Sequence, residues 1–244
     1  NSFLEADKFL KIAATTNTIG VHKKFFKKFK LYYPSLYHLN DQVKHLPNIS
    51  LEITKIINPY SEIKDNASIL LKKIRREISG LQGKIGQSFN SALKSAKNAG
   101  YLDEIKESII DNHRVLAVTA MYRKKVIGSL LGSSKSGGIV YIAPQATLAY
   151  QRELQNLEYE EKQEVIRILI ELSDKIRPSV EIIESYLIYL THIDVIASKA
   201  KYANSINATL PKILDTKKLY FKNAFHPILW KKNNEEGLKI IPQT

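Results

Sequence analysis

The chain has 244 residues, with 37 Lys and Arg against 24 Asp and Glu, a formal net charge of +13, and no cysteine. The lack of cysteine excludes disulfide scaffolds and cysteine-ligated zinc or iron–sulfur sites. Hydrophobic residues make up 44% of the chain, which is typical of a folded protein, and charged residues interrupt its most apolar stretches, so we expect no membrane span. The first residues do not resemble a signal peptide, and we expect a cytoplasmic protein with a polyanionic partner.

The positive charge is unevenly distributed along the chain. Residues 1–99 hold 17 basic and 7 acidic side chains, whereas residues 151–210 hold 7 basic and 10 acidic ones. The basic surface is therefore expected on the first half of the protein and on local loops.

The N-terminal segment, residues 5–31, has a helical period with two distinct faces. Aromatic side chains fall on one face of its second half and lysines on the other: Phe25, Phe26, Phe29 and Tyr33 against Lys23, Lys24, Lys27, Lys28 and Lys30. A basic amphipathic helix of this kind can lie on a membrane or on phosphates. The simpler interpretation, a core helix with a lysine-rich solvent face, is the one we favour.

Two longer helical patterns follow. In residues 66–100, apolar side chains recur at steps of three and four, as in a coiled-coil seam: Leu71, Ile74, Ile78, Leu81, Ile85, Phe89, Leu93 and Ala96. A second pattern runs from Pro144 to about Ile206, and Pro178 is expected to kink or split it. A helix of about 60 residues would span about 90 Å and needs a partner, for which residues 66–100 are the natural choice.

Between these helices the period changes to that of short β-strands. Three such runs are predicted at 114–120, 126–131 and 139–142, and we expect them to form a small antiparallel meander. The predicted fold is mainly α, with long antiparallel lever helices carrying a small antiparallel β insertion at their tip. The corresponding segments are 1–107 (helical core and first lever arm), 108–143 (β unit), 144–210 (returning lever helix) and 211–244.

The last segment, residues 211–244, returns to short apolar runs, including 219–221, 226–230 and 238–242. These runs resemble the first strands of another domain, and we expect its remainder to lie beyond Thr244.

The sequence lacks the common motifs for metal binding and nucleotide binding. The histidines form no His-x-x-x-His pair, and Gly132-x-x-x-x-Gly137 lacks the Lys and Ser/Thr that complete a phosphate-binding P-loop. Nucleases hold Mg²⁺ with carboxylates such as Glu158, Glu160, Glu161 and Glu164, but a solvated helix face explains these four more simply. We expect no catalytic residue, no metal site and no cofactor in this chain.

The β unit is the best candidate for a binding site. Arg123, Lys124 and Lys125 place three cations in one turn, and the next turn offers hydroxyls, a cation and backbone N–H groups at Ser134, Lys135 and Ser136. Proteins contact phosphates with such groups. Tight turns rich in Gly, Ser and Lys are also common without any ligand, and the position at the tip of a long arm favours function.

Five stretches resemble the MutS superfamily, and most of all its second bacterial branch, the MutS-like recombination suppressors. They are 114–128 (RVLAVTAMYRKKVIG), 134–146 (SKSGGIVYIAPQA), 153–162 (ELQNLEYEEK), 193–203 (IDVIASKAKYA) and 225–229 (FHPIL). The last is similar to the His-Pro-Leu-Leu stretch that opens the ATPase domain of this superfamily.

The resemblance implies lever helices, interrupted by a clamp that touches DNA and followed by a dimerising ATPase. Arg123, Lys124, Lys125 and Lys135 would lie in the clamp, and His226 and Pro227 would begin the ATPase fold. The Walker motifs, with their ATP and Mg²⁺, would lie beyond Thr244, so the parent protein is expected to be an ATPase and a homodimer while this chain hydrolyses no ATP.

The leading hypothesis is therefore a lever-and-clamp portion of a MutS-like ATPase of DNA mismatch repair or recombination control, which holds duplex or branched DNA through phosphates. The alternative is a helical arm that contacts RNA or the ribosome. A purely structural helical module is the third possibility, and a nuclease active within this chain is the least favoured.

Overall fold

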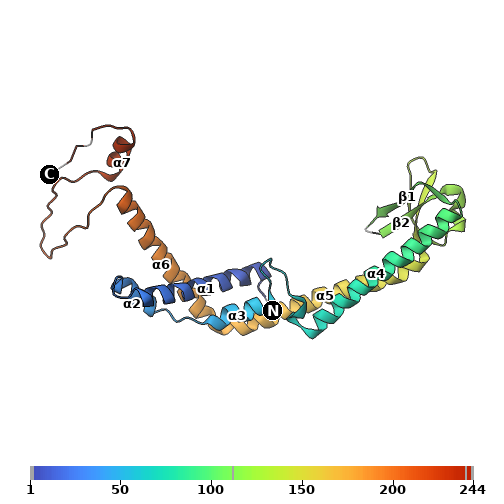
Figure 1. Cartoon of the computed structure of the whole chain (residues 1–244), viewed down its shortest axis with the longest axis horizontal. Helices are drawn as coiled ribbons and strands as arrows, with labels where there is room; N and C mark the ends of the chain where they lie inside the picture. The colour runs from blue at the N-terminus through green and yellow to red at the C-terminus, as the bar shows by residue number, and fades with distance from the viewer. Residues whose placement is uncertain (1–2, 112, 240, 243–244) are drawn as a thin grey trace. The chain divides into compact units, whose positions relative to one another are not determined.

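The computed structural model describes residues 3–111, 113–239 and 241–242, and it is mainly helical with one small sheet (Figure 1). The predicted fold class, lever-type helices with a small antiparallel β insertion, is confirmed. The elements in chain order are α1 (Ala6–Lys28), α2 (Pro34–Asp41), α3 (Pro47–Ile56), η1 (Asp65–Ala67), α4 (Ile69–Asn98), β1 (Leu102–Ile110), β2 (His113–Thr119), η2 (Ala120–Lys125), β3 (Gly128–Ser133), β4 (Ile139–Pro144), α5 (Gln145–Ile176), η3 (Arg177–Ser179), α6 (Val180–Ser205) and α7 (Pro227–Glu235).

The chain forms two compact units, each made of separated segments. The first joins the chain up to Asn17 with Leu46–Ser179, and the second joins Thr18–His45 with the chain from Val180 onward. The four segments predicted from the sequence follow chain order instead, and their boundaries stay predictions. In the described part of the chain, no helix combines the length and the apolar character that crossing a membrane requires.

The first unit is built on an antiparallel hairpin of α4 and α5, which lie side by side (Figure 1). The predicted seam is confirmed, because all eight of its α4 side chains are buried or half-buried. The buried apolar side chains of α5, Ile168, Leu169, Leu172 and Ile176, lie past the start of α4, because Ser68 bonds to Glu164. Ser68 caps the start of α4, where its Oγ accepts a hydrogen bond from the Leu71 N–H at 2.9 Å.

The structure bears on two predictions for the returning helix: its split at Pro178 and its start at Pro144. The 3₁₀ turn η3 contains Pro178 and separates α5 from α6, which confirms the predicted split. Pro144 lies one residue before α5, as the last residue of β4, because its extended backbone serves both the strand and the helix cap.

The sheet at the tip of this hairpin, here called the tip sheet, comprises β1 to β4 with η2. It has four antiparallel strands in the order β1-β2-β4-β3. The predicted three-stranded meander is therefore wrong in two ways. An additional charged edge strand, β1, pairs with β2, and β4 lies between β2 and β3 because the η2 connection is long enough to pass from one side of β4 to the other.

The second unit packs the latter part of α1 and α2 against α6. Its core contains Ile19, Val43, Tyr186 and Tyr189. The buried Asn40 donates a hydrogen bond from Nδ2 to the Tyr189 hydroxyl at 2.8 Å. This polar bond inside an apolar cluster fixes the register of α2 against α6.

The strands expected in 211–244 are absent from the described residues of that segment. Residues 227–235 instead form α7, because Pro227 occupies its first turn and His226 caps it through a hydrogen bond from the Leu229 N–H to His226 Nδ1 at 3.4 Å. Part of the predicted run 238–242, Ile240, lies outside the described residues.

Candidate nucleic-acid interface

The tip sheet is fixed to the hairpin by a shared apolar core. Phe89 and Ala96 of α4 pack with Leu116, Val118, Val140 and Ile142 of the two central strands. Burying a side chain of this size stabilises a fold by about 1.5–3 kcal/mol. The sheet is therefore a rigid platform from which its loops project.

The first cationic segment is the last turn of η2. Arg123, Lys124 and Lys125 are exposed, and none of them forms an ion pair with any described residue. Tyr122, in the same turn, is half-buried, and its ring lies 4.9 Å from that of Tyr101. The turn is thus anchored by one side chain while its three cations point into solvent.

The second segment is the loop between β3 and β4, which is closed by its own hydrogen bonds. The Gly137 N–H donates to the Ser134 carbonyl at 2.9 Å, and the Ile139 N–H donates to Ser134 Oγ at 3.1 Å. Gly137 has a φ of +71°, which favours glycine. Lys135 and Ser136 are exposed, whereas the Ser134 hydroxyl helps to build the turn.

Backbone contacts place the two ends of the η2 connection at the two ends of β4. The Ala120 N–H donates to the Gly138 carbonyl at 2.9 Å, and the Gln145 N–H donates to the Ile127 carbonyl at 3.1 Å. The connection that carries η2 therefore follows the whole length of β4, about 20 Å. Duplex DNA places one phosphate per about 3.4 Å of helix axis on each strand, so a surface about 20 Å long can face several phosphates.

We call Arg123, Lys124, Lys125 and Lys135 the cationic rim. Two further cations of the sheet are not part of it: Lys106 lies on the edge strand β1, and Arg114 is already neutralised. Its Nη2 lies 2.6 Å from Glu107 Oε2, and its guanidinium stacks 4.1 Å from the centre of the Phe89 ring. The structure thus separates a structural arginine from four cations without a partner among the described residues, which the sequence alone does not do.

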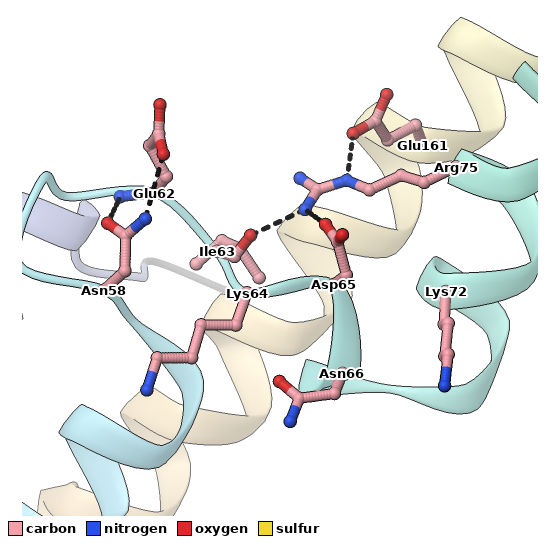
Figure 2. Close-up of a pocket in the computed structure, with 9 residues that line it drawn as sticks. All are labelled: Asn58, Glu62, Ile63, Lys64, Asp65, Asn66, Lys72, Arg75 and Glu161. Carbon is pink, nitrogen blue, oxygen red and sulfur yellow. Dashed lines mark hydrogen bonds and ion pairs between the residues drawn. The ribbon is translucent and has the colours of Figure 1, made fainter. Parts of the chain in front are cut away.

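A hollow of about 580 Å³ near the start of α4 is another polar site of the first unit. Figure 2 shows Arg75 at its centre, donating to Glu161 at 2.7 Å, to the Ile63 carbonyl at 2.7 Å and to Asp65 at 2.5 Å. These carboxylates raise the pKa of Arg75 against the opposing effect of its burial. The hydrogen bonds of this guanidinium join η1, α4 and α5 to one another. Figure 2 shows Lys64 and Lys72 pointing away from it.

The glutamates of α5 correct one sequence expectation. Glu164 is 4% exposed rather than solvated, and it accepts hydrogen bonds from Arg167 at 2.7 Å and from Ser68 Oγ at 2.6 Å. These bonds, chiefly those from Arg167, lower its pKa. Glu161 and Glu164 therefore hold the hairpin together, and no group of three or more metal-ligating side chains gathers among the described residues.

The chain is similar to several known proteins, although not to any family model. It is 29% identical over its whole length to the protein named Endonuclease MutS2 of Alkaliphilus oremlandii, of which it covers 30%. It is 32% identical over 98% of its length to that of Finegoldia magna, also covering 30%, and 34% identical over 78% to that of Streptococcus equi subsp. equi, covering 24%. The chain is thus similar along its length to part of proteins named Endonuclease MutS2.

These similarities support the MutS-like resemblance that the sequence stretches predicted. The chain spans about 30% of the length of the curated MutS2 proteins it matches. The clamp assignment, the DNA contacts of Arg123 to Lys125 and Ser134 to Ser136, and the start of an ATPase at His226 stay predictions.

Proposed function

We propose that this chain is the lever-and-clamp portion of a MutS2-like protein and that its cationic rim binds duplex or branched DNA through phosphate contacts. The observation that carries the proposal is the rim itself: four exposed cations without ion pairs among the described residues. Three lie on the connection that runs along β4 and one lies in the β3–β4 loop, on a sheet packed against a long hairpin. The MutS2 names of the relatives favour DNA over other polyanions.

The proposed contact is one of position and not of base sequence. Lysine and arginine side chains on loops reach phosphates, while readout of base edges needs an element that enters a groove. The described rim contains a short 3₁₀ turn and a tight loop, which suit backbone contact. We therefore propose binding with little sequence preference.

The proposal extends to the longer relatives. Their name includes an endonuclease activity, which is theirs; for this chain we propose DNA binding. We further propose that ATP and Mg²⁺ act in a separate ATPase region of a homodimeric protein, and that α4 and α5 couple the DNA-bound rim to that region. A dimer that closes two rims around one DNA would bind far more tightly than a single chain.

The test compares two variants that remove the same charges from different places. The first replaces Arg123, Lys124, Lys125 and Lys135 with Ala. The matched control replaces Lys55, Lys72, Arg76 and Lys84 with Ala, which are also exposed and without an ion pair among the described residues. Fluorescence anisotropy measures the binding of duplex DNA and of a four-way junction at a fixed low salt concentration.

We expect the rim variant to lose at least about tenfold in affinity for both DNAs, and the control to stay close to the unchanged chain. Equal losses in the two variants would refute a localised site. Structured RNA that fully displaces DNA at equal charge would instead favour the RNA- or ribosome-contacting arm.

A further inference from the structure

The second unit carries a partly exposed aromatic cluster at the end of α1, which the proposed function does not use. The cluster, here called the aromatic corner, consists of Phe25, Phe29, Tyr32 and Tyr33. The Phe25 ring centre lies 4.8 Å from that of Phe29 and 6.3 Å from that of Tyr33, and Phe29 lies 6.3 Å from Tyr32. Tyr32 is 79% exposed and Tyr33 47% exposed.

The corner is held in place from beneath. Phe25 contacts the buried Phe26 at 5.3 Å, Phe26 contacts His22 at 5.9 Å, and His22 contacts Tyr189 of α6 at 5.8 Å. The backbone N–H groups of both Tyr32 and Tyr33 donate to the Phe29 carbonyl at 3.0 Å. Phe25 and the backbone turn that carries Tyr32 and Tyr33 are therefore ordered, which reduces the entropy cost for a ligand that stacks there.

The surroundings of the corner are strongly basic. Residues 18–45 contain six lysines and one acidic residue, Asp41. Lys23 donates to the Asp41 carbonyl at 3.1 Å, whereas the remaining lysines of the helix end are exposed and form no ion pair with a described residue: Lys24, Lys27, Lys28 and Lys30. The Lys28 ammonium lies 5.3 Å from the centre of the Phe29 ring.

The combination of aromatic rings and ammonium groups indicates which class of ligand fits the aromatic corner. An uncharged apolar partner would leave four lysines without a counterpart. A membrane surface would need a continuous free apolar helix face; Ile19 and Phe26 are buried in their own unit, and the exposed Val21, Phe25 and Leu31 are interleaved with lysines in the sequence. A duplex keeps its bases stacked inside, out of reach of the rings. A single strand offers both phosphates and unstacked bases.

We propose that the aromatic corner, with Lys24, Lys27, Lys28 and Lys30, binds single-stranded nucleic acid. Bases stack on the exposed rings and phosphates lie against the ammonium groups. No feature of the corner reads the sugar, so DNA and RNA strands bind comparably. This surface belongs to the second unit and is independent of the cationic rim.

The test uses the full 244-residue chain with the four rim cations replaced by Ala, so that failure of the rim proposal does not affect it. In this background Tyr32→Ala with Tyr33→Ala removes two stacking surfaces. Tyr32→Phe with Tyr33→Phe keeps them, and Tyr60→Ala with Tyr220→Ala is a matched control at two other exposed tyrosines. The probes are 20-nucleotide oligo(dT), oligo(U), a 20-base-pair duplex and vesicles containing an anionic phospholipid.

The alanine pair is expected to weaken binding of oligo(dT) and oligo(U) at least about tenfold, because one stacked base contributes a factor of about 5 to 150. The phenylalanine pair and the matched control should bind these strands as the parent does. The proposal is overturned if the alanine pair binds the strands unchanged, if duplex affinity falls by the same factor, or if the parent binds only the vesicles.

Discussion

Gly128, at the start of β3, is the position where one added methyl group should loosen the tip sheet. A Cβ placed there would lie 2.1 Å from the Ala143 carbonyl oxygen and 2.7 Å from Ile142 Cγ2. Carbon contacts of this kind need well over 3 Å, so β3 must move away from β4 by about 1 Å.

The cost of the Gly128→Ala substitution follows from that movement. A displacement of about 1 Å takes a backbone hydrogen bond beyond its normal range. Losing two such bonds at about 0.5–1.5 kcal/mol each, together with local packing, amounts to about 2–4 kcal/mol. The matched change, Gly83→Ala in the interior of α4, meets nothing within 4 Å and should stabilise the helix by up to about 1 kcal/mol.

Amide hydrogen exchange followed by mass spectrometry reads this effect locally. Peptides covering β3 and β4 of Gly128→Ala should lose protection about 30- to 700-fold, which corresponds to 2–4 kcal/mol, while peptides of α4 and α5 away from the sheet keep theirs. Gly83→Ala should leave the sheet unchanged and raise protection in α4. Wild-type protection of β3 in Gly128→Ala would refute the close approach of the two strands.

Three further predictions concern polar groups inside the two units. Glu164→Gln should lower the free energy of unfolding by about 1–2 kcal/mol through the lost ion pair with Arg167. Because the folded state lowers the Glu164 pKa below its ordinary 4.5, this contribution is complete above pH 4.5 and fades as the pH falls through the lowered value, so acid denaturation curves of the two proteins should converge. Tyr189→Phe leaves the buried Asn40 amide without its acceptor and should cost about 1–3 kcal/mol by urea denaturation; a smaller loss than 0.5 kcal/mol would contradict the bond. Burial lowers the pKa of His22 below 6.5, so its neutral form stabilises the second unit above pH 6.5 and this stability declines as the pH falls through the lowered value; His22→Phe should remove that pH dependence in thermal melts.

The helical part of the fold was predictable because its signals are local and long. The seam from Leu71 to Ala96 repeats over eight positions, and Pro178 removes a backbone donor wherever it stands in a helix. Strand β1 escaped prediction because it is an edge strand: Asp103, Glu104 and Lys106 break its apolar pattern, and an edge tolerates them.

The site was predictable in composition but not in arrangement. The sequence identifies Arg123 to Lys125 and Lys135 as cations in turns, yet only strand order places both turns beside β4. Partners far apart in sequence could not be predicted either: Glu164 is hydrogen-bonded to Ser68, 96 positions away, and Arg75 is paired with Glu161, 86 positions away. Charge in a sequence therefore shows neither whether it is paired nor what it faces.

The salt dependence of duplex binding tests the central claim, that the cationic rim holds DNA by its phosphates. The logarithm of the association constant is measured against the logarithm of salt concentration for the unchanged chain, the rim variant and the matched control at Lys55, Lys72, Arg76 and Lys84. Each phosphate contact contributes a slope of about 0.9, so the rim variant should be shallower by about 3 to 4, with the control unchanged. A rim variant as steep as the unchanged chain would contradict the account.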